Sequence, residues 1–180
     1  FEKSADFTIK RIIEIFGIIL IIFSILLLLS FASYSPEDPN FIFNSEKEIE
    51  NILGFRGSYT SDIFFQSFGL IAYLIPVTLI FTGIYIFRSK KIFILLRNLF
   101  YTILYIILGS FFFSFFYKET FWLTINGNGG FVGSYLNNSF LNDLTKINQI
   151  VTYYFLVIII LLIFLISVSY THLTLPTIRL

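Results

Sequence analysis

The chain has 180 residues, of which 57% are hydrophobic and only 13% are charged, and its formal net charge is +1. A soluble domain carries about 25% charged residues, so this composition predicts an integral membrane protein. A charge this small gives no global field that would attract nucleic acid. The absence of cysteine excludes disulfides, thiolate metal sites and a cysteine nucleophile. Because methionine is also absent, we expect the chain to be a fragment.

Four uncharged segments are long enough to cross a bilayer as helices. A helix needs about 20 apolar residues to cross roughly 30 Å of hydrocarbon. The segments are residues 15–34, 63–87, 98–117 and 147–168. The sequence therefore predicts an all-α integral membrane fold with four transmembrane helices.

The shorter connections predict the topology of these spans. Residues 1–14 form a polar segment before the first span, and residues 88–97 join the second and third spans. The latter turn holds four cations and no acid, namely Arg88, Lys90, Lys91 and Arg97. Lys and Arg concentrated in short loops are retained on the cytoplasmic side. We therefore expect this topology-determining turn and both termini in the cytoplasm.

The two longer connections, residues 35–62 and 118–146, hold only two Lys or Arg each and are expected on the outer side of the membrane. In the first, residues 46–53 are compatible with a short helix. Ser61 and Asp62, which precede an apolar run, predict a helix N-cap.

The second long connection contains a glycine-rich stretch over residues 126–133. It superficially resembles a phosphate-binding loop, but it follows a membrane span instead of a strand. Val132 also stands where the dinucleotide fingerprint needs glycine. We interpret the stretch as a flexible outer turn that leads into a short surface helix over residues 131–144.

Small residues of the second span fall on one predicted helical stripe, which comprises Gly69, Ala72, Pro76 and Gly83. Small side chains on one face let helices approach closely in lipid. Two interpretations stay open, packing within this chain and a contact face between subunits. Pro76 is also expected to kink the span.

The third span ends in an aromatic run over residues 111–117, which predicts lipid-facing bulk and an interfacial belt. Residues 169–180 differ in style from the rest of the chain. From about Ser167 onward the sequence resembles a translated sequencing adapter, so we expect an artefactual tail in which His172 and Arg179 carry no function. A genuine linker after the fourth span is the alternative.

Four motifs, in this order, resemble the N-terminal membrane domain of the FtsK/SpoIIIE family of DNA translocases. Residues 33–39 resemble the family's S-x-x-P-x-D-P element, and residues 51–57 its N-x-x-G-x-x-G turn. Residues 61–76 resemble its A-D-x-x-x-x-x-F-G-x-x-A-Y-x-x-P opening of the second span. Residues 129–133 resemble its G-G-x-x-G before the fourth span. The resemblance covers roughly residues 11–167.

The resemblance implies a multi-pass domain in the bacterial inner membrane that anchors and assembles a DNA translocase at the division septum. The family's cytoplasmic part is a RecA-like motor that forms a hexamer and pumps double-stranded DNA with ATP. That part is missing here, so no catalytic, cofactor-binding, metal-binding or DNA-binding residue carries over. ATP and Mg²⁺ are expected only for the motor. The expected partners are membrane lipid, further copies of the chain and division-site proteins, with DNA reached only through the missing region.

Two other functional classes fit less well. A small four-span transporter or channel is the alternative, but such proteins place ionisable groups within their spans. All four spans lack Asp, Glu, Lys, Arg and His. A membrane-embedded enzyme would need a nucleophile–base pair or metal ligands, and the one histidine lies in the suspected tail. We therefore expect no enzymatic activity from the chain itself.

Overall fold

The computed structural model describes residues 2–39, 48–119, 123, 125–139, 143 and 146–169, and within these ranges every regular element is a helix. Four helical runs in this part of the chain are long and apolar enough to cross a membrane. They cover Phe7–Ala32, Gly54–Ser89, Phe93–Phe116 and Gln149–Val168. The predicted fold class, an all-α protein with four membrane-spanning helices, is confirmed.

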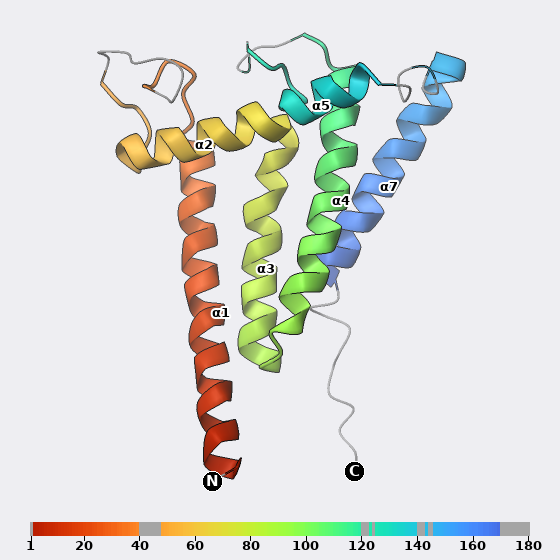
Figure 1. The fold of residues 1–180 in the computed structure, drawn as a ribbon. Coiled ribbons are helices and arrows are strands. Elements are labelled where there is room, and N and C mark those ends of the chain that lie inside the picture. The colour runs from red at the N-terminus through yellow and green to blue at the C-terminus, as the bar shows by residue number, and fades with distance from the viewer. Residues whose placement is uncertain are drawn as a thin grey trace.

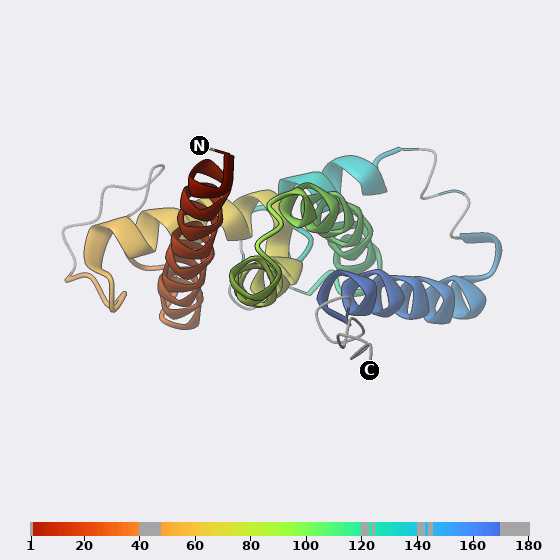
Figure 2. The same cartoon turned by 90° about the horizontal axis from the view of Figure 1, so that it is seen from below.

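The membrane-crossing helices form an open row (Figures 1 and 2). Helix α1 (Glu2–Ala32) packs against α3 (Leu74–Ser89). Helix α3 contacts α4 (Phe93–Phe116), which packs against α7 (Gln149–Ser169). Only 17% of the most apolar window of α1 and of α7 is buried, against 44% and 39% for the second and third spans. The first and last spans are therefore the two outer edges of the row.

Two further helices lie across one end of this row, at the top of Figure 1. They are α2 (Gly54–Phe68) and α5 (Gly130–Asn137), and we call them together the platform. The opposite end holds the turn between α3 and α4, with its Lys and Arg side chains, and we call it the basic end.

The second span differs from the single helix expected over residues 63–87. Residues 63–68 belong to α2 in the platform, and the chain turns at Gly69, whose φ is +73°. A 3₁₀ helix, η1 (Gly69–Tyr73), then leads into α3. The five residues of η1 and the sixteen of α3 rise about 34 Å together, at ~2.0 and ~1.5 Å per residue. This length suffices for about 30 Å of hydrocarbon.

Two local predictions for this region are wrong. Ser61 and Asp62 form no N-cap, because α2 begins at Gly54 and both residues are buried within it. No kink is needed at Pro76, which is the third residue of α3. The N–H groups of a helix's first turn have no intrahelical acceptor, so proline costs little there. The bend lies in the preceding 3₁₀ segment instead.

Other boundaries also differ from those expected. Residues 2–14 are helical and continue directly into the first span, because a helix need not end at the edge of the hydrocarbon. The described residues 48–53 are not helical, and α5 ends at Asn137. Helix α4 begins at Phe93, which places Arg97 within the helix. The parts of these predictions that fall on residues 46–47, 140–142, 144–145 and 170–180 lie outside the described residues.

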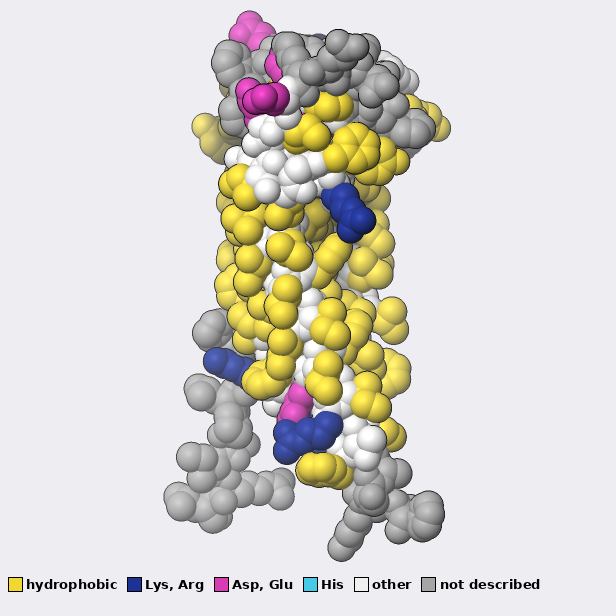
Figure 3. Space-filling model, turned by 90° about the vertical axis from the view of Figure 1, so that its left-hand side faces the viewer, with side chains coloured by type: hydrophobic (Ala, Val, Ile, Leu, Met, Phe, Trp, Pro, Cys, Tyr) yellow, Lys and Arg dark blue, Asp and Glu magenta, His cyan; other side chains and the backbone are white. Residues whose placement is uncertain are grey.

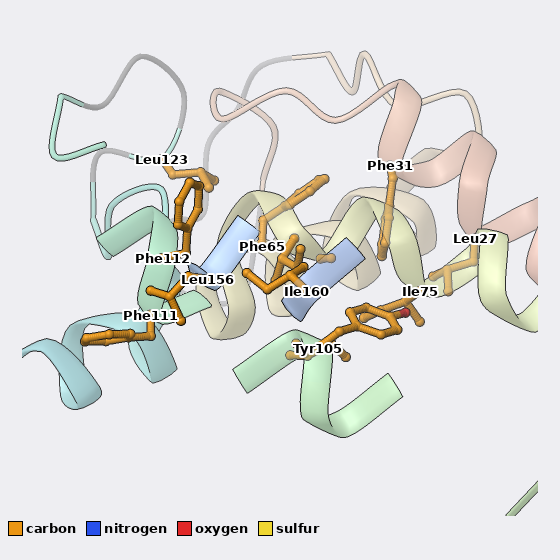
Figure 4. Close-up of a cluster of buried hydrophobic side chains, with 13 residues drawn as sticks. Leu27, Phe31, Phe65, Ile75, Tyr105, Phe111, Phe112, Leu123, Leu156 and Ile160 are labelled. Atoms are coloured by element: carbon orange, nitrogen blue, oxygen red, sulfur yellow. The ribbon is translucent and has the colours of Figure 1, made fainter. Parts of the chain in front are cut away.

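The hydrophobic core gathers near the platform, where buried side chains from every span meet (Figure 4). Phe31 of α1 packs against Phe65 of α2, with 5.0 Å between ring centroids. Two residues of the aromatic run at the end of α4, Phe111 and Phe112, are buried in this core and do not face lipid as predicted, whereas Tyr117 at the end of the run is exposed. Phe112 is buried and packs on Tyr153 of α7, at 5.2 Å between centroids.

A polar seam joins α3 to α4 within the apolar row. The hydroxyls of Thr78 and Tyr105 lie 2.9 Å apart, and Asn98 Nδ2 donates to Thr82 Oγ1 over 2.9 Å. Hydrogen bonds between membrane helices contribute on average about 0.6 kcal/mol each. Each bond adds little free energy, but it forms only when the two side chains face each other. The seam therefore fixes the relative orientation of α3 and α4.

Helices α1 and α3 approach closely where Gly17 faces Gly83. A Cβ atom at Gly83 would lie 2.9 Å from the carbonyl oxygen of Gly17 and 2.7 Å from Ile21 Cγ1. A Cβ atom at Gly17 would lie 2.9 Å from the backbone nitrogen of Phe87. Neither position has room for a side chain, because these backbone atoms cannot move without separating the helices.

We predict that Gly83→Val destabilises the fold by about 1–3 kcal/mol, because the added methyl groups force α1 away from α3. The free energy of unfolding, measured by titrating SDS into mixed micelles, checks this. Ala32→Leu adds bulk at the exposed last residue of α1 and should change that free energy by less than about 0.5 kcal/mol. An unchanged stability in the Gly83 variant would contradict the close approach.

Candidate functional site

The segment that follows α1 is fixed by one buried carboxylate. Asp38 is 2% exposed, and its oxygens accept the backbone N–H groups of Glu50 at 2.8 Å and Asn51 at 3.1 Å. A buried carboxylate needs such donors, because an unpaired charge away from water is strongly unfavourable. The contact brings residues 33–39 against residues 51–57.

Asn51 completes this contact from the other side. Its Nδ2 donates to the carbonyl oxygens of Ser30 at 2.9 Å and Ser33 at 3.2 Å, and its Oδ1 accepts the N–H of Leu53. The last carbonyls of a helix lack intrahelical partners, so Asn51 satisfies groups that α1 leaves open. Gly57 must lack a side chain, because a Cβ atom there would lie 2.0 Å from Asn51 Oδ1. We call these contacts of Asp38 and Asn51 the α1–α2 junction.

A tyrosine and an aspartate strengthen the α1–α2 junction. The hydroxyl of Tyr34 donates to Asp62 Oδ1 over 3.2 Å, and Gln66 Nε2 donates to the same oxygen over 3.3 Å. Burial raises the pKa of Tyr34 well above its ordinary value, and the nearby carboxylate of Asp62 raises it further. The phenol therefore stays protonated and remains a donor.

A second contact fixes the bend between α2 and α3. The N–H of Leu70 donates to the carbonyl oxygen of Asn128 over 2.9 Å, and Ser110 Oγ of α4 donates to the carbonyl oxygen of Phe68 over 2.8 Å. A Cβ atom at Gly69 would lie 2.0 Å from Asn128 O, and one at Gly130 would lie 2.5 Å from the Gly69 nitrogen. We call this the glycine junction. It places the glycine-rich turn against the bend.

The four small residues of the predicted stripe are all buried, but they do not share one partner. Gly69 lies in the glycine junction, and Gly83 packs on α1. Ala72 is fully buried in the hydrophobic core, and Pro76 is fully buried as well. These contacts occupy the stripe within the chain.

The basic residues divide between the turn and the next helix. Arg88, Lys90 and Lys91 are exposed at the turn, while Arg97 is partly buried in α4. Lys90 ends α3 in the left-handed conformation, with φ of +58°. Its Nζ lies 2.8 Å from Glu14 Oε1. The turn therefore lies at the same end of the row as the first half of α1.

Several residues of these contacts could not be identified from the sequence. Glu14 binds Arg11, three residues before it, at 2.5 Å, but its second partner, Lys90, lies far away in the sequence. Gly17 stands alone in an apolar run. Asp38 and Asn51 belong to two of the motifs that resemble the family. The sequence does not indicate that Asp38 binds the segment around Asn51, or that Asn51 binds the end of α1.

We predict that Asn51→Ala lowers the free energy of unfolding by about 1–3 kcal/mol, because it leaves the carbonyls of Ser30 and Ser33 without their donor. SDS titration in mixed micelles measures the loss, and faster hydrogen exchange of the nearby amides should accompany it. Glu50→Gln is the matched control, since Glu50 contributes only its backbone N–H to Asp38. An equal loss in both variants would contradict the role assigned to Asn51.

A comparison with protein families finds a match over residues 9–176 to the 4TM region of the DNA translocases FtsK/SpoIIIE. The matched range includes residues 169–176, so the boundary of the suspected adapter-derived tail stays a prediction. No solved structure matches the chain. The matched range contains both junctions, the basic turn and, except for Phe7 and Thr8, all four spans. The chain belongs to the family of four-transmembrane regions of the DNA translocases FtsK/SpoIIIE.

Proposed function

We propose that the chain anchors and assembles a DNA translocase at the division septum of a bacterial inner membrane, where the full-length protein couples chromosome segregation to cell division. The family match over residues 9–176 is the observation that carries this proposal. In the full-length protein, an ATP-driven motor would pump double-stranded DNA, and ATP, Mg²⁺ and DNA would bind that motor. The chain itself would have no enzymatic activity.

The geometry of the spans supports an anchoring role. Helix α1 begins at the basic end of the row, and α7 runs from the platform side toward that end (Figure 1). Short basic turns favour the cytoplasmic side, so a motor following α7 would lie in the cytoplasm with the basic turn. The platform would then lie on the outer side, where it is available to division-site proteins.

We predict that a fluorescent protein fused to the chain after α7 forms a band at the constriction of dividing cells. A uniform signal around the cell periphery would contradict septal anchoring.

Orientation is tested separately in the cysteine-free chain with Tyr135→Cys, on the platform, and Lys91→Cys, at the basic turn. A membrane-impermeant maleimide applied to intact cells should label the first variant, and label the second only after permeabilisation. The reverse pattern would contradict the topology.

Assembly into a homo-oligomer, a hexamer by family resemblance, would use the edges of the row. The small-residue stripe is buried within the chain, whereas Ile22 of α1 and Leu161 of α7 are 54% and 53% exposed. A contact between the α1 edge of one copy and the α7 edge of the next is heterologous, and such contacts form a ring when the rotation between copies closes.

We predict that Ile22→Cys and Leu161→Cys variants, mixed in one membrane, form a disulfide-linked heterodimer on mild oxidation. Ala72→Cys is the control, because its fully buried side chain should not reach another copy. Non-reducing electrophoresis with differently tagged copies separates mixed dimers from dimers of one variant. Dimers formed mainly by the Ala72 variant, or mainly within the Ile22 variant alone, would contradict the edge-to-edge arrangement.

A further inference from the structure

Helix α5 lies beside the last two turns of α4 (Figures 1 and 2). A Cβ atom at Gly133 would lie 2.2 Å from the carbonyl oxygen of Ser110. One at Gly129 would lie 2.7 Å from the backbone nitrogen of Ser114. Since α4 ends at Phe116, these two serines lie about 9 and 3 Å below its end. Helix α4 is about 36 Å long and the hydrocarbon about 30 Å thick, so α5 lies at the platform-side boundary of the hydrocarbon.

The face of α4 that α5 covers is the one that faces lipid elsewhere. Leu96, Ile103 and Ile107 are exposed along this face. Steps of three and four residues continue it to Ser110 and then to Ser114. Ser110 is nonetheless fully buried, because α5 packs there. Helix α5 therefore lies between the end of α4 and the lipid that surrounds the rest of this face.

The opposite face of α5 carries two exposed aromatic side chains. A residue two positions further along a helix lies about 200° round the axis. Because Gly129 and Gly133 face α4, Phe131 and Tyr135 point away from it. Their exposed fractions are 63% and 70%, and their rings stack with 6.4 Å between centroids. Both rings therefore point to the side where lipid contacts the lower part of α4.

The sequence around α5 carries no charge. Between Glu119 and Asp143 it contains no Asp, Glu, Lys, Arg or His. About a quarter of the residues of a soluble domain are charged, so a water-exposed segment of this length would contain several. Figure 3 shows the same pattern on the α1 face, where hydrophobic side chains form a band and charged side chains lie near its two ends. The segment around α5 thus shares the charge pattern of the lipid-facing band.

We propose that α5 is an interfacial membrane helix, and that Phe131 and Tyr135 bind phospholipid of the leaflet on the platform side. Phe131 contacts the acyl chains. The ring of Tyr135 lies beside them and its hydroxyl reaches the headgroups, where water-soluble reagents still have access. Aromatic side chains with one polar end favour this boundary. Helices with one apolar face lie there, in the plane of the membrane, without crossing it.

Protein partners fit this surface less well than lipid does. A water-soluble partner would have to enter the bilayer to reach the two rings. A second copy of the chain would also have to cover the exposed face of α4, which continues below them at Ile107 and Ile103. Lipid covers the rings and this face together. The proposal does not depend on a septal role.

The test uses the full chain in vesicles, with a tryptophan as reporter. Phe131→Trp is made in a background where Trp122, the one native tryptophan, is replaced by Phe. The vesicles are phosphatidylcholine with bromine on the acyl chains, either near the headgroup or near the chain end. Iodide on both sides of the membrane is the quencher in water. We expect strong quenching by brominated lipid, strongest with bromine near the headgroup, and weak quenching by iodide.

Three further variants in the same background calibrate the result. Ile103→Trp reports the exposed face of α4 about 10 Å deeper than Ser110, so bromine near the chain end should quench it best. Glu50→Trp replaces an exposed, charged side chain and should respond mainly to iodide. Tyr135→Trp is a second reporter on α5, and it should also be quenched best by bromine near the headgroup.

Two results would overturn the proposal. Strong quenching of both α5 reporters by iodide, with weak quenching by brominated lipid, would place the two rings in water, as for Glu50→Trp. Weak quenching of both reporters by either quencher would show that protein covers the rings. If brominated lipid then quenched them only after the protein was diluted in the vesicles, the covering protein would be a second copy.

Discussion

The path of the chain at Gly69 determines the architecture, because backbone groups near hydrocarbon must find partners within the protein. A single helix over the 36 residues Gly54–Ser89 would be about 54 Å long, much more than the ~30 Å of hydrocarbon. The bend divides this run into a part that lies in the platform and a part that crosses. Its backbone groups are satisfied by Asn128 and Ser110, so the bend is stable only when α4 and the glycine-rich turn are in place.

The platform therefore adds a connection between α1 and α4, which are not neighbours in the row. Helix α1 is attached to it through Asn51, and α4 through Ser110. All four quoted motifs contribute residues to one of the two junctions. These residues form hydrogen bonds to the backbone or allow close packing at glycine, and such interactions stabilise a fold. This agrees with the anchoring role that we propose.

The number of spans, their approximate limits and the common location of the basic turn and the first half of α1 could be predicted from the sequence. Long uncharged segments indicate the spans, and the charged residues between them indicate where the spans end and which ends lie on the same side. The bend could not be predicted, because residues 63–68 are as apolar as a span and hydropathy does not distinguish a surface helix from a crossing one. The same error affects Gly69 and Gly83, because their shared stripe assumed one continuous helix. Contacts such as Asn51 with Ser30 stay hidden because no pattern in the sequence records which distant carbonyl an amide reaches.

The basic end shows how a long first helix is accommodated. Helix α1 has 31 residues and is about 46 Å long, so part of it must extend beyond the hydrocarbon. Its platform end is fixed by Asn51, which leaves the excess length at the basic end. Glu14 lies near that boundary with its side chain only 13% exposed, and an unpaired carboxylate would be costly there. Lys90 and Arg11 neutralise it, so the ion pair lets α1 continue past the boundary while it holds the α3–α4 turn at the same depth.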